Sequence, residues 1–248
     1  MKNRDILIIG AIILVGAVSI ELFFDWYNPF IDYAPGPFTS LTVGTPQRFD
    51  YYKDGTLIGT YSYTLTAQTS LGHTLYTLDT TVNATYQGNQ ILVNTTHRFL
   101  NETTHVSYSV DSKISGAESR LDCSFVGGNV IITSASQKKN ATTSVALAPD
   151  TVLIDNNDAA HWELLMKSFT AEEGKRYHVN TLVPQGGNVQ QIEFGVDSSD
   201  QYVNIGSRSY DCVVAREPNF EITLYFYQGS LIEYRNDVDG VVIVKRLG

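Results

Sequence analysis

The sequence predicts a mainly β protein, a long antiparallel meander with one packed helix, preceded by a transmembrane helix. Three observations predict this class: apolar and polar side chains alternate from Leu41 onward, glycine-containing turn signals separate the alternating runs, and a long apolar run opens the chain. A period of two is typical of half-buried strands, and short turns favour antiparallel neighbours.

Residues 1–24 are expected to form a membrane anchor. The run Ile6–Ile20 is uncharged and almost wholly apolar, and Lys2 and Arg4 precede it. Basic residues ahead of such a run hold the N-terminus in the cytoplasm. We therefore expect a single-pass protein of the cell membrane, with residues 25–248 on the extracytoplasmic side.

Cleavage is the alternative to anchoring. As a helix, Ile6–Phe24 would rise about 28 Å, close to a hydrocarbon core of about 30 Å. Trp26 and Tyr27 follow, where interfacial aromatic residues lie. The small residues of Ala17–Ser19 instead offer a signal-peptidase site, which would release the rest of the chain. Both interpretations export the domain.

Residues 25–40 are expected to be a linker and residues 41–248 one extracytoplasmic β domain. Pro29, Pro35 and Pro37 deny hydrogen bonds to helix and sheet, so the linker should be an extended spacer. The formal net charge of −9 argues against nucleic acid as a partner, because nucleic-acid binding needs positive surface.

Within the domain, ten to twelve strands are expected. Tyr61, Tyr63 and Leu65 show the alternation, and turn signals such as Gln87–Asn89 and Gly127–Asn129 separate the runs. The other runs are Leu75–Tyr86, Gln90–Phe99, His105–Val110, Arg120–Val126, Val130–Ser134, Thr142–Leu147, Tyr177–Val183, Val189–Val196, Tyr210–Ala215, Glu221–Tyr227 and Val241–Arg246.

One segment, Ala159–Phe169, has helical periodicity. Its apolar residues Trp162, Leu165 and Phe169 recur at spacings of three, four and seven, and the capping residues Asp155–Asp158 precede it. A single amphipathic helix must bury its apolar stripe, and the concave face of a curved sheet is the surface that could receive it.

The two cysteines and four sequons suggest covalent modification. In an oxidising compartment, Cys123 and Cys212 are most simply one disulfide, and two buried free thiols are the alternative. Asn-x-Thr triplets in one Thr-rich stretch indicate glycosylation of one solvent-facing side. The four acceptor residues are Asn83, Asn94, Asn101 and Asn140.

Signatures of catalysis are weak, so no enzymatic activity and no cofactor are expected. His97 and His105 lie on neighbouring predicted strands with Glu102 between them, which would bring the histidines together across a hairpin. They are interpreted as surface residues, with a metal-dependent hydrolase as the alternative. The acidic segment at Asp155 lacks the glycine and glutamate of a calcium loop, so helix capping explains it better.

The domain resembles the LolA/LppX-like lipoprotein-carrier superfamily over Leu41–Gly248. The resemblance rests on element order and on three segments: the opening pair Tyr52–Tyr61, the segment Leu153–Asn157 that leads into the helix, and the closing hairpin Tyr225–Tyr234. It implies a strongly curved antiparallel sheet, an open or partly closed barrel, that wraps an apolar cavity plugged by the helix and able to hold acyl chains. Many bacterial members are soluble or lipid-anchored, whereas this chain carries an apolar anchor of its own.

Two functions follow as expectations. The first is a membrane-anchored binding module that holds an apolar small molecule, a lipid or isoprenoid, in the concavity of the sheet. The second is a structural or accessory cell-surface protein with a filled core, no ligand and a protein partner at the cell surface. The residues expected to line the ligand site are Trp162, Leu165, Phe169, Tyr61, Tyr63 and Phe194.

Overall fold

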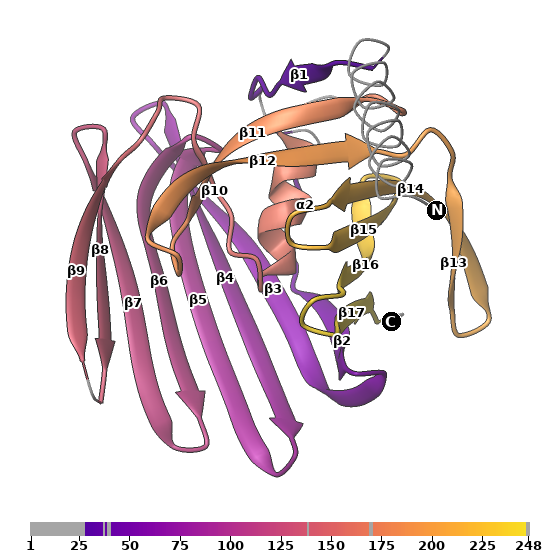
Figure 1. The fold of residues 1–248 in the computed structure, drawn as a ribbon, viewed down its shortest axis with the longest axis horizontal. Helices are drawn as coiled ribbons and strands as arrows, with labels where there is room; N and C mark the ends of the chain where they lie inside the picture. The colour runs from indigo at the N-terminus through magenta and orange to yellow at the C-terminus, as the bar shows by residue number, and fades with distance from the viewer. Residues whose placement is uncertain (1–27, 37, 39–40, 138, 169–170, 247–248) are drawn as a thin grey trace, which may run out of the picture.

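The computed structural model describes residues 28–36, 38, 41–137, 139–168 and 171–246. The predicted anchor, residues 1–24, and the predicted ligand residue Phe169 lie outside these ranges. Within them, no helix has the length and apolar character needed to cross a membrane. The mainly β class is confirmed: the described chain forms one large curved sheet and a single α-helix (Figure 1).

The described strands number 17, more than the ten to twelve expected, because short strands such as β1, β10 and β13 acquire partners only in the folded protein. Their bounds are β1 Phe30–Asp32, β2 Gln47–Lys53, β3 Thr56–Ser70, β4 His73–Tyr86, β5 Asn89–Asn101, β6 Thr104–Ile114, β7 Ala117–Val126, β8 Asn129–Ser136, β9 Asn140–Ala146, β10 Val152–Leu153, β11 Arg176–Val183, β12 Asn188–Val196, β13 Gln201–Ile205, β14 Arg208–Glu217, β15 Ile222–Tyr227, β16 Ser230–Asn236 and β17 Val241–Lys245.

From one edge, the strand order is β1, β10, β11 to β17, and then β2 to β9. Neighbours are antiparallel except for the parallel pairs that β1 and β10 make with β11. Among the described strands the two edges of the sheet do not pair with each other, so the predicted curved sheet is present and is not closed into a barrel. Part of the predicted linker belongs to the sheet, because β1 pairs with β11 and Tyr33 is buried.

A seam between β17 and β2 joins the two parts of the sheet. Val241 pairs with Lys53 and Lys245 with Phe49, so a late strand lies between β16 and the first long hairpin. On one side of this seam β3 to β5 have 13 to 15 residues, and the strands shorten from 11 residues in β6 to seven in β9. The strands on the other side have ten residues or fewer. We call β3 to β9 the long-strand half and β11 to β17 the short-strand half.

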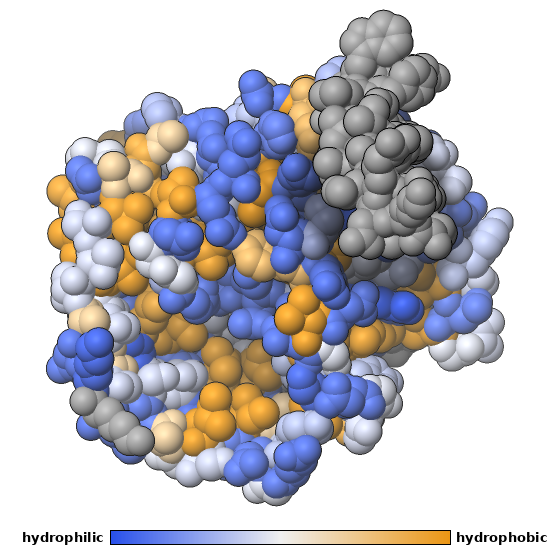
Figure 2. All heavy atoms as spheres, viewed as in Figure 1, coloured by the Kyte–Doolittle hydropathy of each residue, from blue (hydrophilic) through white to orange (hydrophobic). Residues whose placement is uncertain are grey.

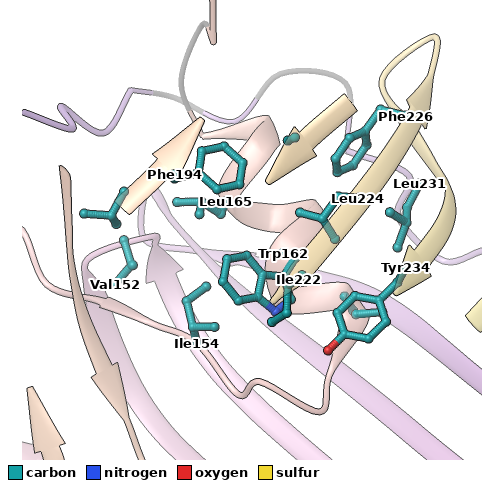
Figure 3. Packing of buried hydrophobic residues seen from close by; sticks show 14 of the residues in the cluster. Val152, Ile154, Trp162, Leu165, Phe194, Ile222, Leu224, Phe226, Leu231 and Tyr234 are labelled. Carbon is teal, nitrogen blue, oxygen red and sulfur yellow. The ribbon is translucent and has the colours of Figure 1, made fainter. Parts of the chain in front are cut away.

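The helix α2, Ala159–Lys167, lies on the concave side of the sheet, between β11 and β12 in front and the long strands behind (Figure 1). Trp162 and Leu165 turn their apolar side chains into the main core, where Trp162 stacks on Phe194 with ring centroids 6.4 Å apart. Figure 3 shows this packing against Ile222. The predicted amphipathic helix is confirmed over the described residues.

The cysteine prediction is wrong in the structure, which holds Cys123 and Cys212 as buried free thiols. Cys123 on β7 pairs with Tyr108 on the concave face, where both belong to a core cluster beside β10. Cys212 on β14 belongs to a separate cluster with Val214, whereas its neighbour Val213 packs against the main core. The two thiols therefore face opposite sides of the sheet and lie in different clusters.

Candidate functional site

Tyrosine hydroxyls from both halves of the sheet converge on residues 155–172, the segment that contains α2. Such a convergence holds the helix by directed hydrogen bonds in addition to apolar packing. The six tyrosines are Tyr33, Tyr61, Tyr63, Tyr108, Tyr177 and Tyr234.

Asp158 joins the N-terminus of α2 to the long-strand half. Its Oδ1 accepts hydrogen bonds from the backbone N–H of Ala160 at 3.1 Å and from the Tyr61 hydroxyl at 2.5 Å. Its Oδ2 accepts from Thr80 Oγ1 at 2.8 Å. Burial and the nearby Asp158 carboxylate raise the pKa of Tyr61 well above its ordinary value, so this phenol stays protonated and remains a donor. One side chain thus caps the helix and attaches it to β3 and β4.

Two further tyrosines bind the residues just before the helix. The Tyr108 hydroxyl of β6 donates to Asp155 Oδ2 at 2.6 Å, and the Tyr234 hydroxyl of β16 donates to the backbone carbonyl of Asn156. Burial, followed by the Asp158 charge, raises the pKa of Asp155 above its ordinary value. The entrance to the helix is therefore held from both halves of the sheet.

The other end of α2 is held by a buried ion pair and by a hydroxyl contact. Lys167 Nζ lies 3.1 Å from Glu163 Oε1, and both side chains are buried. The Tyr63 hydroxyl donates to the second oxygen of Glu163, and the Tyr33 hydroxyl lies 2.5 Å from Ser168 Oγ. Removing either charge would leave the other buried without its ion-pair partner, which is strongly destabilising.

A histidine pair lies beside this helix entrance. Nε2–H of His105 donates to the Thr151 carbonyl at 3.1 Å, so its Nδ1 accepts from Nε2–H of His97, also at 3.1 Å. Burial lowers the pKa of His105 to about 4. Burial, followed by the repulsion from His161 and His105, lowers the pKa of His97 well below its ordinary value. Both rings are therefore neutral at pH 7.

The same ring of His97 borders a small cavity together with His161 and Glu102. Its volume is about 20 Å³, which is room for roughly one water molecule. His97 Nδ1, His161 Nε2 and Glu102 Oε1 are buried and have no protein partner among the described residues. Burial raises the pKa of Glu102 to about 7, so this carboxyl is protonated in about half of the molecules near that pH.

The histidines correct one expectation and confirm another. His97 and His105 do meet across the β5–β6 hairpin, as predicted, but they are buried and not surface residues. The hairpin brings them onto the concave face, where the ring centroid of His105 lies 5.1 Å from that of Phe125, which packs against the same core cluster as Leu153. Within the described chain, no group of three His, Cys, Asp or Glu side chains is arranged to hold a metal ion.

The residues predicted to line an apolar ligand site come together but fill the concavity instead of lining it. Trp162, Leu165, Tyr61, Tyr63 and Phe194 belong to one buried cluster. The two described cavities that border α2 have volumes of about 20 Å³ each, too small for an acyl chain. The helix stripe occupies the volume that the sequence assigned to a ligand.

The predicted glycosylation sites are exposed. Asn83, Asn94 and Asn140 alternate with concave-facing neighbours and therefore point to the convex face of the long-strand half. Asn101 is the last residue of β5, and its Oδ1 accepts from the backbone N–H of Thr104 across the turn at 2.8 Å. These positions are accessible to a modifying enzyme, and glycosylation itself stays a prediction.

Sequence reasoning missed the tyrosine contacts on the helix segment. Tyr61 and Asp158 are 97 positions apart, and Tyr108 and Asp155 are 47 apart. The signal was present in part, because tyrosines occupy one face of predicted strands and acidic residues gather before the helix. Only the register of the sheet determines which phenol meets which carboxylate.

Comparisons with known proteins place this chain in no family. No family model matches the sequence, and no curated protein matches it. A solved structure of a DUF1089 family protein from Pseudomonas aeruginosa aligns with 83% of this chain and 96% of its own length, at 9% identity and a TM-score of 0.41. A similarity at this level carries no argument about fold or function, and the resemblance to lipoprotein carriers stays a prediction.

Proposed function

We propose that the protein is a membrane-anchored, extracytoplasmic accessory protein of the cell surface, without catalytic activity, whose curved sheet is filled by its own helix. The apolar run Ile6–Ile20 and the basic residues Lys2 and Arg4 ahead of it support this location. The partner that fits this role is another protein at the cell surface.

The observation that carries the proposal is the way in which α2 is held in the concavity. Phenol–carboxylate contacts such as Tyr61–Asp158 and Tyr108–Asp155 attach the helix segment to the sheet, and the helix residue Trp162 is fully buried. A hydrogen bond to a charged group contributes about 1.5–3 kcal/mol. A ligand that entered the concavity would have to break several of these bonds and displace the helix stripe.

Native mass spectrometry and solvent extraction of the full-length protein, purified from its membrane, test the proposal. We expect the mass of the polypeptide and its covalent modifications alone, and an extract with no more lipid than a detergent-only control. A stoichiometric apolar molecule that survives exchange into a second detergent would contradict it.

A second candidate function is apolar ligand binding below the helix. Val82 pairs with Val93, and Val110 pairs with Leu121, on the same face of the sheet as the main core. These side chains are only half-buried, and Figure 2 shows apolar atoms over the lower parts of the long strands. An acyl or isoprenoid chain could lie here without displacing α2.

The replacement Val93→Asp distinguishes the two candidates, with Asn94→Asp on the opposite face as the matched control. If the half-buried apolar residues around Val93 bind a lipid, Val93→Asp should abolish the co-purifying molecule and Asn94→Asp should retain it. If the accessory role is correct, neither variant nor the wild type carries one.

A further inference from the structure

One edge of the sheet has no partner among the described strands. β9 is the last strand in the order, and among the described strands only β8 pairs with it. Its residues are exposed except for Val145, whose side chain reaches the core cluster that contains Cys123. β12 approaches this strand through Val189 in the same cluster, without a ladder between the two.

The outward backbone groups of β9 follow from its pairing with β8. Lys139 O accepts from Ser136 N, and Leu147 N donates to Gly128 O, so odd-numbered residues of β9 bond to β8. Hydrogen-bonding direction alternates along an antiparallel strand, so the even-numbered residues direct their N–H and C=O groups away from the sheet. These residues are Asn140, Thr142, Ser144 and Ala146.

This edge lacks the usual protection against strand addition. β8 and β9 carry no charged residue and no proline, and the described charged residue in the turn between them is Lys139. The opposite edge is different, because β1 and β10 are only three and two residues long and Val152 and Leu153 are buried. Long uncharged edges are templates for pairing with another chain.

We propose that β9 pairs with β9 of a second copy of this chain, antiparallel about a two-fold axis at Thr143. In this register Asn140 lies opposite Ala146 of the other copy and Thr142 lies opposite Ser144, so every outward-facing residue meets another one. Thr143 then lies opposite its own counterpart in a non-hydrogen-bonded pair. The edge is self-complementary, as an isologous interface requires.

Charge selects the antiparallel arrangement. The turn that precedes β9 contains Lys139. In a parallel pair the Lys139 residues of the two copies would lie side by side at one end, where like charges repel. In the antiparallel pair each Lys139 lies opposite Leu147 of the other copy, eight residues from the other Lys139, so the two are about 27 Å apart at about 3.4 Å per residue. The proposal identifies the partner without depending on the presence of an apolar ligand, so it is independent of which proposed function holds.

Disulfide trapping tests this register in the full-length protein, in membranes of a host without N-glycosylation, so that Asn140 is bare. Thr143→Cys places two thiols directly opposite each other, where Cα atoms lie about 4.5 Å apart and a disulfide can form. Thr142→Cys is the matched control, because its own counterpart lies on the diagonal, more than about 7 Å away. Cys123 and Cys212 are buried and provide little background.

We expect mild oxidation to convert most of Thr143→Cys to a covalent dimer on a non-reducing gel, at least fivefold more than Thr142→Cys. Equal cross-linking of the two variants, or none, would overturn the proposal. A second measurement uses Ser144→Pro, which removes an outward N–H that no described residue of the same chain accepts, and Ser144→Ala as its control. In detergent-corrected light scattering, the wild type and Ser144→Ala should be dimers and Ser144→Pro a monomer with an unchanged melting temperature. A monomeric wild type would refute the idea, as would a dimeric Ser144→Pro.

Discussion

The long-strand half and the short-strand half of the sheet bury their residues in different ways. In the long-strand half, β3 is buried at Tyr61, Tyr63 and Leu65, near the helix, and exposed towards its end at Ser70. In the short-strand half, β15 is buried along five of its six residues, because the main core covers one face and the cluster with Val203 covers the other. The comparison shows that stability is concentrated around α2 and in the short strands, whereas strand length beyond the helix provides surface.

A matched pair of leucine truncations should show the largest difference between the halves. Leu224→Ala removes a fully buried side chain in the short-strand half and should lower the free energy of unfolding by about 3–4 kcal/mol. Leu92→Ala lies on the convex face of the long-strand half and should lower it by about 1 kcal/mol. Urea denaturation measures both, and equal losses would remove the distinction between the halves.

Acid should weaken the site where β5, β6 and α2 meet. The pKa of His105 is about 4 in the folded protein and 6.5 in the unfolded chain, so the unfolded chain binds the proton first as the pH falls. The contribution of this difference to the free energy of unfolding is present above pH 6.5 and is lost as the pH falls towards 4. Its size is on the order of 3 kcal/mol. Denaturation at pH 7, 5.5 and 4.5 should show the decline, and His105→Gln should reduce it.

The carboxyl of Glu102 changes the free energy of unfolding with pH in the opposite direction. Its pKa is raised to about 7 by burial, so its contribution is present below the ordinary value of 4.5 and is lost as pH rises towards 7. Repeating the pH series in Glu102→Gln should therefore steepen the net acid-induced decline. A series identical to that of the wild type would contradict the assignment of these groups.

Removal of one phenolic hydroxyl should separate the two ends of the long-strand half. Tyr61→Phe leaves the buried Asp158 with one donor fewer and should lower the free energy of unfolding by about 2 kcal/mol. Tyr86→Phe removes a hydroxyl that donates to Asp54 at 2.8 Å on the exposed end, and its effect should stay within about 0.5 kcal/mol. Thermal melts suffice, and comparable losses would show that the tyrosines act only as core.

Reduction should have the smallest effect. Cys123 lies in one half of the sheet and Cys212 in the other, both as free thiols, so a reducing agent should leave the melting temperature unchanged. Thiol titration of the denatured, unreduced protein should find both cysteines reactive. Two cysteines that do not react with the thiol reagent, together with a melting temperature lowered by reduction, would show that the disulfide is present.

Local patterns in the sequence were sufficient to predict the strands and the helix, but not which residues contact one another in the folded protein. Alternation predicted β4 to β6 closely, and spacing and capping predicted the helix that Asp158 begins. The faces of Cys123 and Cys212 could not be predicted, because each strand pattern is consistent with either side of a sheet until the core is known. The burial of His97 and His105 depended on β10 and the helix, which follow them in the chain by more than forty residues.

The seam between β2 and β17 has a consequence for the order in which the chain can fold. Roughly 190 residues separate Lys53 from Val241, which pair directly. At about 5–20 residues per second, synthesis leaves β2 without this neighbour for about 10–40 s. During that interval β2 offers unpaired backbone groups to any passing strand, so a chaperone that covers this edge would be of most use before β17 emerges.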